Sequence, residues 1–284
     1  MLSLSINSVT FRGRRLGFVC LFSIVLFAGK CFGISNEEPF GAPVKAKIIG
    51  HRGGVIDSTY TENSMAGLEA AYKRGYYMAE IDIRLTRDGQ LIILHDATLN
   101  NYYHVNKAAK DLTWDEIRGL KSDRDGSSPV LLEDALKYCK GRLQVMLDTK
   151  ITGNDTVNFK KIEDLLTKYS LLDNAMVIGS NEIRSYFDGK SKTGYSINAL
   201  KQLKSRYEFK PERYFLFSHG NEIKEEDVKW AQANHVMVVP SINKYHYFRD
   251  IPFMEGAKRD IENLKKWGVV YYQIDSEFDR WLVN

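Results

Sequence analysis

The sequence is poor in cysteine. Only three of its 284 residues are cysteines, and two of them, Cys20 and Cys31, lie within the first 33 residues. The third, Cys139, has no partner for an internal disulfide in the rest of the chain, which excludes a disulfide-stabilised scaffold. Its place in an apolar helical stretch (LLEDALKYCK) predicts a packing role. At this length a hydrophobic core can stabilise the fold without cross-links.

A surplus of positive charge is also lacking over most of the chain. The formal charge is +4, but the first 33 residues contain four basic residues and no acidic ones. Taking these four from the 40 lysines and arginines leaves 36, which equals the 36 aspartates and glutamates. Proteins that bind nucleic acid by counterion release need an excess of Lys and Arg. We therefore expect no nucleic-acid partner.

The N-terminal segment has the pattern of a secretory signal peptide. Three arginines between residues 12 and 15 precede an apolar run of 11 residues over 18–28, which is short for a membrane span but sufficient for a signal-peptide core. Small residues at Cys31 and Gly33 predict cleavage after Gly33, so residues 1–33 are expected to direct export, to a periplasm or to full secretion. An uncleaved anchor is one alternative. A lipoprotein is disfavoured because Lys30, not a small residue, precedes Cys31.

Residues 34–284 contain no linker, charge block or low-complexity tract, so we expect one domain. Short apolar runs alternate with amphipathic stretches of 3.6-residue spacing. The runs cover residues 46–50, 77–85, 91–94, 143–147, 175–178, 193–197, 214–217, 236–239 and 269–274. This alternation predicts the α/β class and first of all a (β/α)8 TIM barrel. A doubly wound open sheet is the alternative, but no G-x-G-x-x-G or Walker loop follows the first run.

Two of the expected strands carry acidic residues among their apolar ones. In the run 77–85, alternation places Glu80, Asp82 and Arg84 on one face and apolar residues on the other. In a barrel the apolar face meets the helices, so the carboxylates point inward. Asp148 and Lys150 repeat this pattern at the end of the run 143–147. Close carboxylates repel each other unless a cation lies between them, so the three acids predict an oxygen-ligand site for one divalent cation, Ca²⁺ or Mg²⁺. A solvated edge strand is the alternative for the first run.

Two histidines stand directly after expected strands. His51 follows residues 47–50, and His95 follows residues 91–94. Residues at the carboxyl ends of barrel strands face the active site, and imidazole suits proton transfer near neutral pH. With the cations Arg52 and Lys150 nearby, the set suits an anionic substrate, most simply a phosphate ester. A structural role is the alternative for either histidine alone. The other four lie in expected loops or helices without acidic strand-end partners and are predicted to be surface or structural residues: His104, His219, His235 and His246.

Five short motifs occur in a fixed order along the chain. They are His51-Arg52-Gly53, Thr61-Glu62-Asn63-Ser64, Glu80-Ile81-Asp82, His95-Asp96-Ala97-Thr98-Leu99 and Asp148-Thr149-Lys150. In this order they resemble the motifs of the glycerophosphodiester phosphodiesterase family. The resemblance is strong from about residue 47 to residue 150 and fainter beyond. It implies a (β/α)8 barrel and metal-dependent hydrolysis of small glycerophosphodiesters to glycerol 3-phosphate and an alcohol.

Carried over motif by motif, the resemblance implies roles for nine residues. They are an acid/base pair (His51, His95), ligands of the divalent cation (Glu80, Asp82, Asp148), cations that hold phosphate oxygens (Arg52, Lys150), and supporting residues at the start of the next helix (Glu62, Asn63). The residues leave open which histidine is the base, and whether water or the substrate's 2-hydroxyl is the nucleophile. They favour no oligomeric state.

The sequence departs from the family's pattern at several positions. Asp148 stands where the family usually has Glu, Thr61 replaces its Pro, and residues 239–243 replace its aromatic W-T-V-N segment. Two alternative functions therefore stay open. One is a related barrel phospholipase, of the phosphatidylinositol-specific C or sphingomyelinase D kind. It would need exposed apolar groups on the rim, for which residues 102–103 and 245–248 are candidates, although the sequence does not indicate membrane contact. The other is a non-catalytic binder of phosphorylated headgroups.

Overall fold

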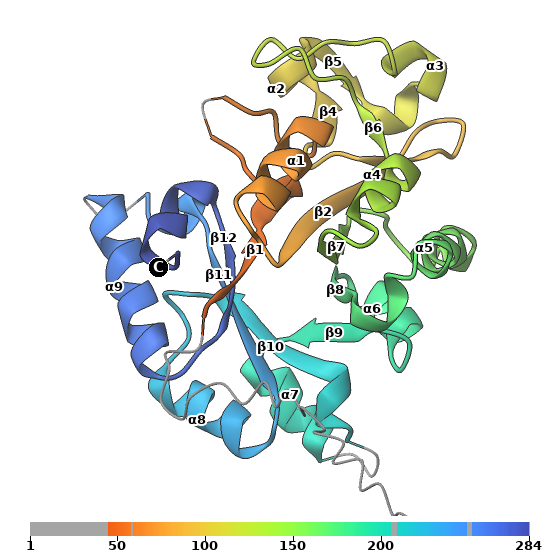
Figure 1. Ribbon diagram of the computed structural model, residues 1–284. Coiled ribbons are helices and arrows are strands. Elements are labelled where there is room, and N and C mark those ends of the chain that lie inside the picture. The colour runs from red at the N-terminus through yellow and green to blue at the C-terminus, as the bar shows by residue number, and fades with distance from the viewer. Residues whose placement is uncertain (1–44, 58, 206–208, 249–251, 284) are drawn as a thin grey trace, which may run out of the picture. The chain divides into compact units, whose positions relative to one another are not determined.

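The computed structural model describes residues 45–57, 59–205, 209–248 and 252–283, which all belong to one compact unit spanning residues 43–284 (Figure 1). The expected signal peptide over residues 1–33 and its cleavage site lie outside the described residues. In the part of the chain that is described, no helix has both the length and the apolar character needed to cross a membrane.

Eight parallel strands form a closed barrel. Neighbouring strands pair in sequence order from β7 to β12, β12 pairs with β1, and pairings of β2 with both β1 and β7 close the ring. This confirms the predicted (β/α)8 barrel and excludes the open sheet. The strands are β1 (Lys47–Gly50), β2 (Met78–Leu85), β7 (Gln144–Thr149), β8 (Met176–Gly179), β9 (Lys192–Tyr195), β10 (Tyr214–His219), β11 (Met237–Ile242) and β12 (Tyr271–Ile274).

Amphipathic helices follow most of the barrel strands and bury their apolar stripes against them. Side-chain caps begin several of these helices: Ser64 accepts a hydrogen bond from the backbone N–H of Gly67, and Asp155 accepts one from that of Asn158. Cys139 lies fully buried on α4, which confirms its packing role. The helices are α1 (Met65–Lys73), α4 (Leu132–Cys139), α5 (Thr156–Lys168), α6 (Asn181–Phe187), α7 (Ile197–Lys204), α8 (Glu225–Ala233) and α9 (Phe253–Lys266), with the 3-10 helices η1 (His51–Gly53), η3 (Leu172–Asn174), η4 (Pro211–Arg213), η5 (Lys244–His246) and η6 (Ser276–Trp281).

One expected strand lies outside the ring. The run 91–94 forms β3 (Leu91–Ile93), which pairs antiparallel with β2 after a turn at residues 88–89 and with β6 (Val130–Leu131) on its other side. Between β3 and β6 the chain makes an excursion with its own small core, in yellow to green at the top of Figure 1. The excursion consists of β4 (Thr98–Leu99), α2 (Asn100–Tyr103), β5 (Val105–Ala108), η2 (Ala109–Asp111) and α3 (Trp114–Ile117). It brings His95 to the rim of the barrel.

Apolar side chains fill the interior of the barrel and form a floor below the carboxylates. Met78 and Met146 belong to this interior cluster. Glu80 and Asp148 follow them by two residues in β2 and β7, so period-two alternation directs all four side chains to the same inner face. The acids therefore lie one layer above a dry core, at the carboxyl end where barrel enzymes place their chemistry.

Candidate active site at the carboxyl end of the barrel

The centre of the site is a cluster of three carboxylates from two adjacent strands. Asp82 and Asp148 are direct partners in the parallel register of β2 and β7, and Glu80 precedes Asp82 on the same face. Oxygen atoms of Glu80, Asp82 and Asp148 all lie within 4.8 Å of one another, and Glu80 and Asp82 are each only 1% exposed. The structure thus brings together the three acids that the strand pattern singled out.

Charge within this cluster is only partly balanced. Lys150 donates to Asp148 Oδ2 at 2.6 Å and lies 3.0 Å from Asp82 Oδ1. Burial and repulsion from the two aspartates raise the pKa of Glu80 well above its usual value. Burial also raises the pKa of Asp148, although Lys150 acts in the opposite direction. Burial alone would raise the pKa of Asp82 too, but Lys150 and other neighbours outweigh burial, so the pKa of Asp82 is lowered.

These residues fit a hard divalent cation. Three carboxylates and one ammonium leave a formal charge of −2 in a largely buried space. The donor set is entirely oxygen, as Ca²⁺ and Mg²⁺ prefer. A dication at Glu80, Asp82 and Asp148 would relieve the repulsion that raises the pKa of Glu80.

A strained turn after β1 aims the first motif at this cluster. Arg52 adopts the left-handed conformation (φ 50°, ψ 51°), which costs a non-glycine residue about 1–2 kcal/mol. Its backbone N–H donates to Glu80 Oε2 at 2.7 Å, and its carbonyl accepts from the N–H of Asn63 at 2.7 Å. Gly53 has to be glycine, because a Cβ there would lie 2.8 Å from the Asn63 Cα. The turn is therefore held by β2 and by the start of α1.

His51 is paired with an acid from the last barrel strand. Its Nδ1 lies 2.7 Å from Asp275 Oδ1, and Asp275 Oδ2 accepts from the backbone N–H of Lys244 at 2.7 Å. With a proton on Nδ1, the Nε2 lone pair faces the Asn243 amide at 3.4 Å. Burial would raise the pKa of Asp275, but the bond from His51 and the one from Lys244 outweigh it and lower the pKa. The sequence reasoning missed Asp275, although it follows β12 just as His51 follows β1.

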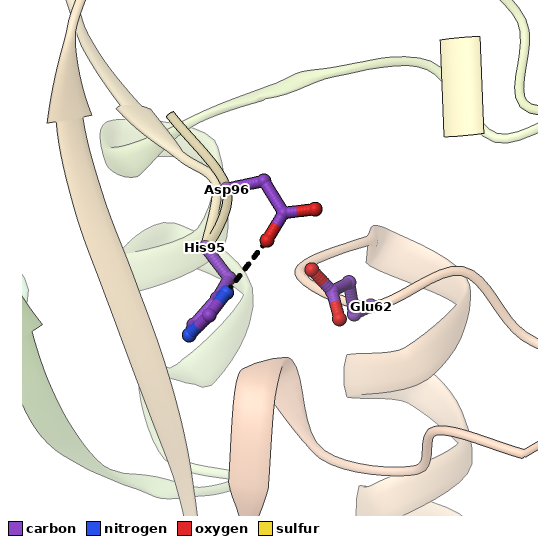
Figure 2. Close-up of side chains that lie close together, drawn as sticks. All are labelled: Glu62, His95 and Asp96. Carbon is purple, nitrogen blue, oxygen red and sulfur yellow. Dashed lines mark hydrogen bonds and ion pairs between the residues drawn. The ribbon is translucent and has the colours of Figure 1, made fainter. Parts of the chain in front are cut away.

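His95 belongs to a second network, in which Arg52 is the central group. The Arg52 guanidinium donates to Glu62 Oε2 at 2.8 Å and approaches His95 Nε2 at 3.1 Å. Because a guanidinium only donates, Nε2 must be the acceptor, so the proton is on Nδ1, which lies 2.9 Å from Asp96 Oδ1. Figure 2 shows Glu62 lying opposite the bonded pair His95 and Asp96. One possible ligand atom from each of the three residues lies within 4.8 Å of the others, a spacing that could hold a cation. Arg52 bonds to both Glu62 and His95, so its guanidinium already supplies positive charge at this second set of possible metal ligands.

The two predicted supporting residues are Asn63 and Glu62. Asn63 contacts the carboxylate cluster, and Glu62 contacts Arg52 of the second network. Asn63 donates through its side-chain amide to Asp82 Oδ2 at 2.9 Å and accepts from the Asp82 N–H at 3.2 Å. Glu62 is 4% exposed and pairs with Arg52. In this structure Arg52 and Lys150, the predicted phosphate-binding cations, both contact carboxylates. Their remaining N–H donors are the groups available to an anionic substrate.

Thr61, which replaces the family's proline, makes hydrogen bonds that hold a neighbouring loop. Its backbone N–H donates to Asp125 Oδ2 at 3.1 Å, and its buried hydroxyl donates to Asp125 Oδ1 at 2.7 Å and lies 2.6 Å from the hydroxyl of Ser122. Proline could make none of these bonds. They fix the loop that carries Arg124, whose guanidinium lies over the ring of Tyr102 at 4.9 Å.

One of the histidine expectations needs correction. His219 is not in a loop but ends barrel strand β10, because that strand runs two residues further than its apolar run. His246 lies on η5, with its ring stacked on His219 at 3.7 Å between ring centroids. Burial and the neighbouring His219 lower the pKa of His246 to about 4. His219 and His104 also have acidic neighbours, Glu222 at 3.4 Å and Asp123 at 3.0 Å.

Two cavities adjoin the carboxylate cluster through residues that contact it: Arg52, whose N–H donates to Glu80, lines the first, and Lys150, which pairs with Asp82 and Asp148, lines the second. The first, of about 490 Å³, is lined by His51, Arg52, Ile56, Asp57, Glu62, Tyr102, Arg124, Asn243, Lys244, Tyr245, Phe248, Asp275 and Glu277. The second, of about 400 Å³, is lined by Arg84, Leu85, Ala97, Ala108, Ala109, Lys110, Lys150, Ile151, Thr152 and Asp155. We call them the His51 cavity and the Lys150 cavity. A ligand at the cluster could extend into either one.

The fold and the site define a class: a (β/α)8 barrel with a cluster of three carboxylates, spaced as cation ligands would be, and two acid-paired histidines at its carboxyl end. The sequence profile of the Glycerophosphoryl diester phosphodiesterase family matches residues 51–272. The chain belongs to this family.

Known relatives agree with this membership. The chain is 32% identical over 124 residues to a glycerophosphodiester phosphodiesterase from Bacillus altitudinis, a match that covers 42% of this chain and 49% of that protein. It is 29% identical over 138 residues to a lysophospholipase D from Homo sapiens, covering 44% of this chain and 42% of that protein. The chain thus matches about half the length of these curated relatives.

Solved structures share the fold. A glycerophosphoryl diester phosphodiesterase from Parabacteroides distasonis superposes with a TM-score of 0.67 at 20% identity, covering 86% of this chain and 90% of that one. A phosphodiesterase from Oleispira antarctica, solved with the product sn-glycerol-3-phosphate, gives a TM-score of 0.67 at 17% identity, covering 84% and 97%. At these identities the similarity shows a common barrel.

Proposed function

We propose that this protein is a metal-dependent phosphodiesterase that hydrolyses glycerophosphodiesters to glycerol 3-phosphate and an alcohol. One observation carries the proposal: Glu80, Asp82 and Asp148 form a single acidic cluster at the rim, and His51 and His95 each have an aspartate on Nδ1. Family membership and the glycerol 3-phosphate bound to the Oleispira antarctica protein support the substrate class.

The carboxylate cluster would hold one divalent cation, Ca²⁺ or Mg²⁺. When bound, the cation supplies Lewis-acid polarisation of the phosphoryl group and neutralises its developing charge. Lys150 and Arg52 would add N–H donors to the phosphate oxygens, since both lie against the cluster or the turn above it.

His51 and His95 would act as the acid/base pair. An imidazole with Nδ1–H bound to a carboxylate presents Nε2 as a base, and the carboxylate stabilises the imidazolium once the proton is taken up. One ring, neutral at Nε2, would take the proton of the nucleophile. The other would enter the step as an imidazolium and give its Nε2 proton to the leaving alkoxide, so that the two rings exchange protonation states. Both histidines have this arrangement, through Asp275 and Asp96.

The test is release of glycerol 3-phosphate from glycerophosphocholine, glycerophosphoethanolamine, glycerophosphoglycerol and glycerophosphoinositol. We expect activity that EDTA abolishes and that Ca²⁺ or Mg²⁺ restores. Replacement of His51 or His95 by alanine should lower turnover about 10²- to 10⁴-fold with the fold intact. Binding without turnover of any of the four would instead identify a non-catalytic headgroup binder.

A lipid substrate is the second candidate. The similarity to a lysophospholipase D and the exposure of Tyr245 and Phe248 at the rim of the His51 cavity favour it. Comparing soluble glycerophosphocholine with lysophosphatidylcholine in vesicles separates the two. A preference for vesicles would also favour the barrel phospholipase alternative over a glycerophosphodiester hydrolase. The protein's export to a periplasm or beyond, with residues 1–33 removed, is part of the same proposal and would give it access to such substrates.

A further inference from the structure

Two aromatic side chains at the mouth of the His51 cavity are unusually exposed. Tyr245 is 78% exposed and Phe248 is 64% exposed, and both line the cavity beside His51 and Arg52. Their ring centroids are 6.3 Å apart with an interplanar angle of 80°. The two rings therefore meet edge-on at nearly a right angle, and we call this pair the aromatic corner.

No cation from the described part of the chain covers the faces of this corner. Among the described residues, no Lys or Arg lies over the ring of Tyr245 or Phe248, whereas the deeper ring of Tyr102 is covered by Arg124. Aromatic faces attract cations, and quaternary ammonium groups are the ligands best suited to them because their desolvation is cheap. The corner is thus an available cation–π surface at one edge of the proposed active site.

The two cavities also differ in the charge of their linings, and this difference too favours a cation at the aromatic corner. Among the described lining residues of the His51 cavity, acids outnumber the permanent cations: Asp57, Glu62, Asp275 and Glu277 face Arg52, Arg124 and Lys244. The described lining of the Lys150 cavity has the opposite balance, with Arg84, Lys110 and Lys150 against Asp155, and it includes no aromatic residue. A cationic substituent on a bound phosphodiester would be repelled from the Lys150 cavity and accepted in the His51 cavity.

The remaining lining argues against a long acyl chain. Among the described residues that line the His51 cavity, Ile56 is the one aliphatic side chain, and charged groups make up most of this lining. An acyl chain there would have to lie across desolvated charges, which is costly. A small cation carrying methyl groups matches both the ring faces and the acidic wall.

The geometry points to the aromatic corner as a subsite for a quaternary ammonium group, so that choline esters are preferred substrates. This inference rests on the proposed function, because it concerns the alcohol end of the same phosphodiester. Tyr245 and Phe248 act as specificity residues that contact the alcohol and take no part in proton transfer.

The test compares glycerophosphocholine with its neutral 3,3-dimethylbutyl isostere, in which carbon replaces the ammonium nitrogen. We expect the wild-type KM to be about 3- to 30-fold lower for the choline ester, the range of one or two cation–π contacts. Tyr245→Leu and Phe248→Leu keep an apolar side chain but remove the ring, and each should bring the ratio of the two KM values toward one. Tyr72→Leu is the matched control, since Tyr72 is exposed on α1 and lines neither cavity. It should keep the wild-type ratio.

Each other outcome overturns the inference. A wild-type ratio near one, or a ratio unchanged in both leucine variants, would remove the subsite. If the two leucine variants stop hydrolysing lysophosphatidylcholine in vesicles but still prefer the choline ester, the aromatic corner binds a lipid instead. If no glycerophosphodiester, including uncharged glycerophosphoglycerol, is hydrolysed, the proposed function fails by itself. In that case calorimetry measures the affinity of the protein for phosphocholine and for 3,3-dimethylbutyl phosphate. Equal affinities would refute the quaternary ammonium subsite.

Discussion

Replacing Asp275 by asparagine tests whether this carboxylate sets the tautomer of His51. Asp275 is 5% exposed and accepts two bonds, from His51 Nδ1 and from the Lys244 N–H. Asparagine has one acceptor oxygen. If this oxygen stays bonded to the Lys244 N–H, the NH₂ group of the asparagine faces His51 Nδ1. Nδ1 must then accept, which forces the ring proton onto Nε2. The nitrogen that faces the cavity then has no lone pair.

The expected loss follows from that tautomer change. We expect kcat/KM for glycerophosphocholine to fall about 10²- to 10⁴-fold, the usual contribution of a positioned acid or base. A ¹⁵N spectrum of the variant should show His51 protonated on Nε2.

Stability should change with a defined dependence on pH. A charge-assisted bond is worth about 1.5–3 kcal/mol, so Asp275→Asn should lower the free energy of unfolding by about that amount at neutral pH. The folded-state pKa of Asp275 is lowered, so this stability is present above the unfolded value of about 3.9 and is lost as the pH falls through the lower folded value. The difference between wild type and variant should therefore vanish in acid.

Asp279→Asn is the matched control for these measurements. Asp279 accepts bonds from the Tyr76 hydroxyl at 2.7 Å and from Arg74 at 3.1 Å, away from both histidines. It should lose stability without a change in kcat/KM. A kcat/KM of Asp275→Asn within about threefold of wild type, or an equal loss in Asp279→Asn, would refute the positioning role.

Three further predictions concern other parts of the chain. Arg52→Lys should lower kcat/KM more than about tenfold, because one ammonium cannot serve Glu62 and His95 together; steady-state kinetics within twofold of wild type would contradict this. Thr61→Val should lower the free energy of unfolding by about 1–3 kcal/mol, because the partners of its buried hydroxyl lose their bonds. Urea denaturation measures the change, and an unaltered midpoint would argue against it. The exported protein should begin directly after Gly33 by N-terminal sequencing, and retention of the full N-terminus would show an uncleaved anchor.

The barrel and its acidic cluster could be predicted because both depend on local periodicity. Alternation within the runs 77–85 and 143–147 placed Glu80, Asp82 and Asp148 on one face, and parallel pairing then made Asp82 and Asp148 neighbours. Asp275 could have been found by the same criterion, since it directly follows the last apolar run. His219 was misplaced because polar residues end β10, where the hydrophobic signal stops before the strand does.

The partnership of Arg52 with Glu62 and His95 could not be predicted in this way. It depends on a left-handed backbone at Arg52 and on the excursion that carries His95 beside the barrel, and neither leaves a periodic signal. The exposure of Tyr245 and Phe248 is equally a tertiary property, since the neighbouring Tyr247 is fully buried. Sequence patterns report which face of an element is apolar, but they do not report which polar groups meet across elements.

The two histidines are unequal because their partners differ in origin. Asp275 comes from the end of a barrel strand, is 5% exposed and is fixed by a backbone N–H, so its charge acts on His51 in a largely dry environment. Asp96 is the chain neighbour of His95 and is about one-third exposed, so water screens its charge. His95 has Arg52 on its other nitrogen, and this guanidinium must shift before Nε2 can accept a proton. The Nε2 atom of His51 therefore faces the neutral amide of Asn243, whereas that of His95 faces a cationic guanidinium.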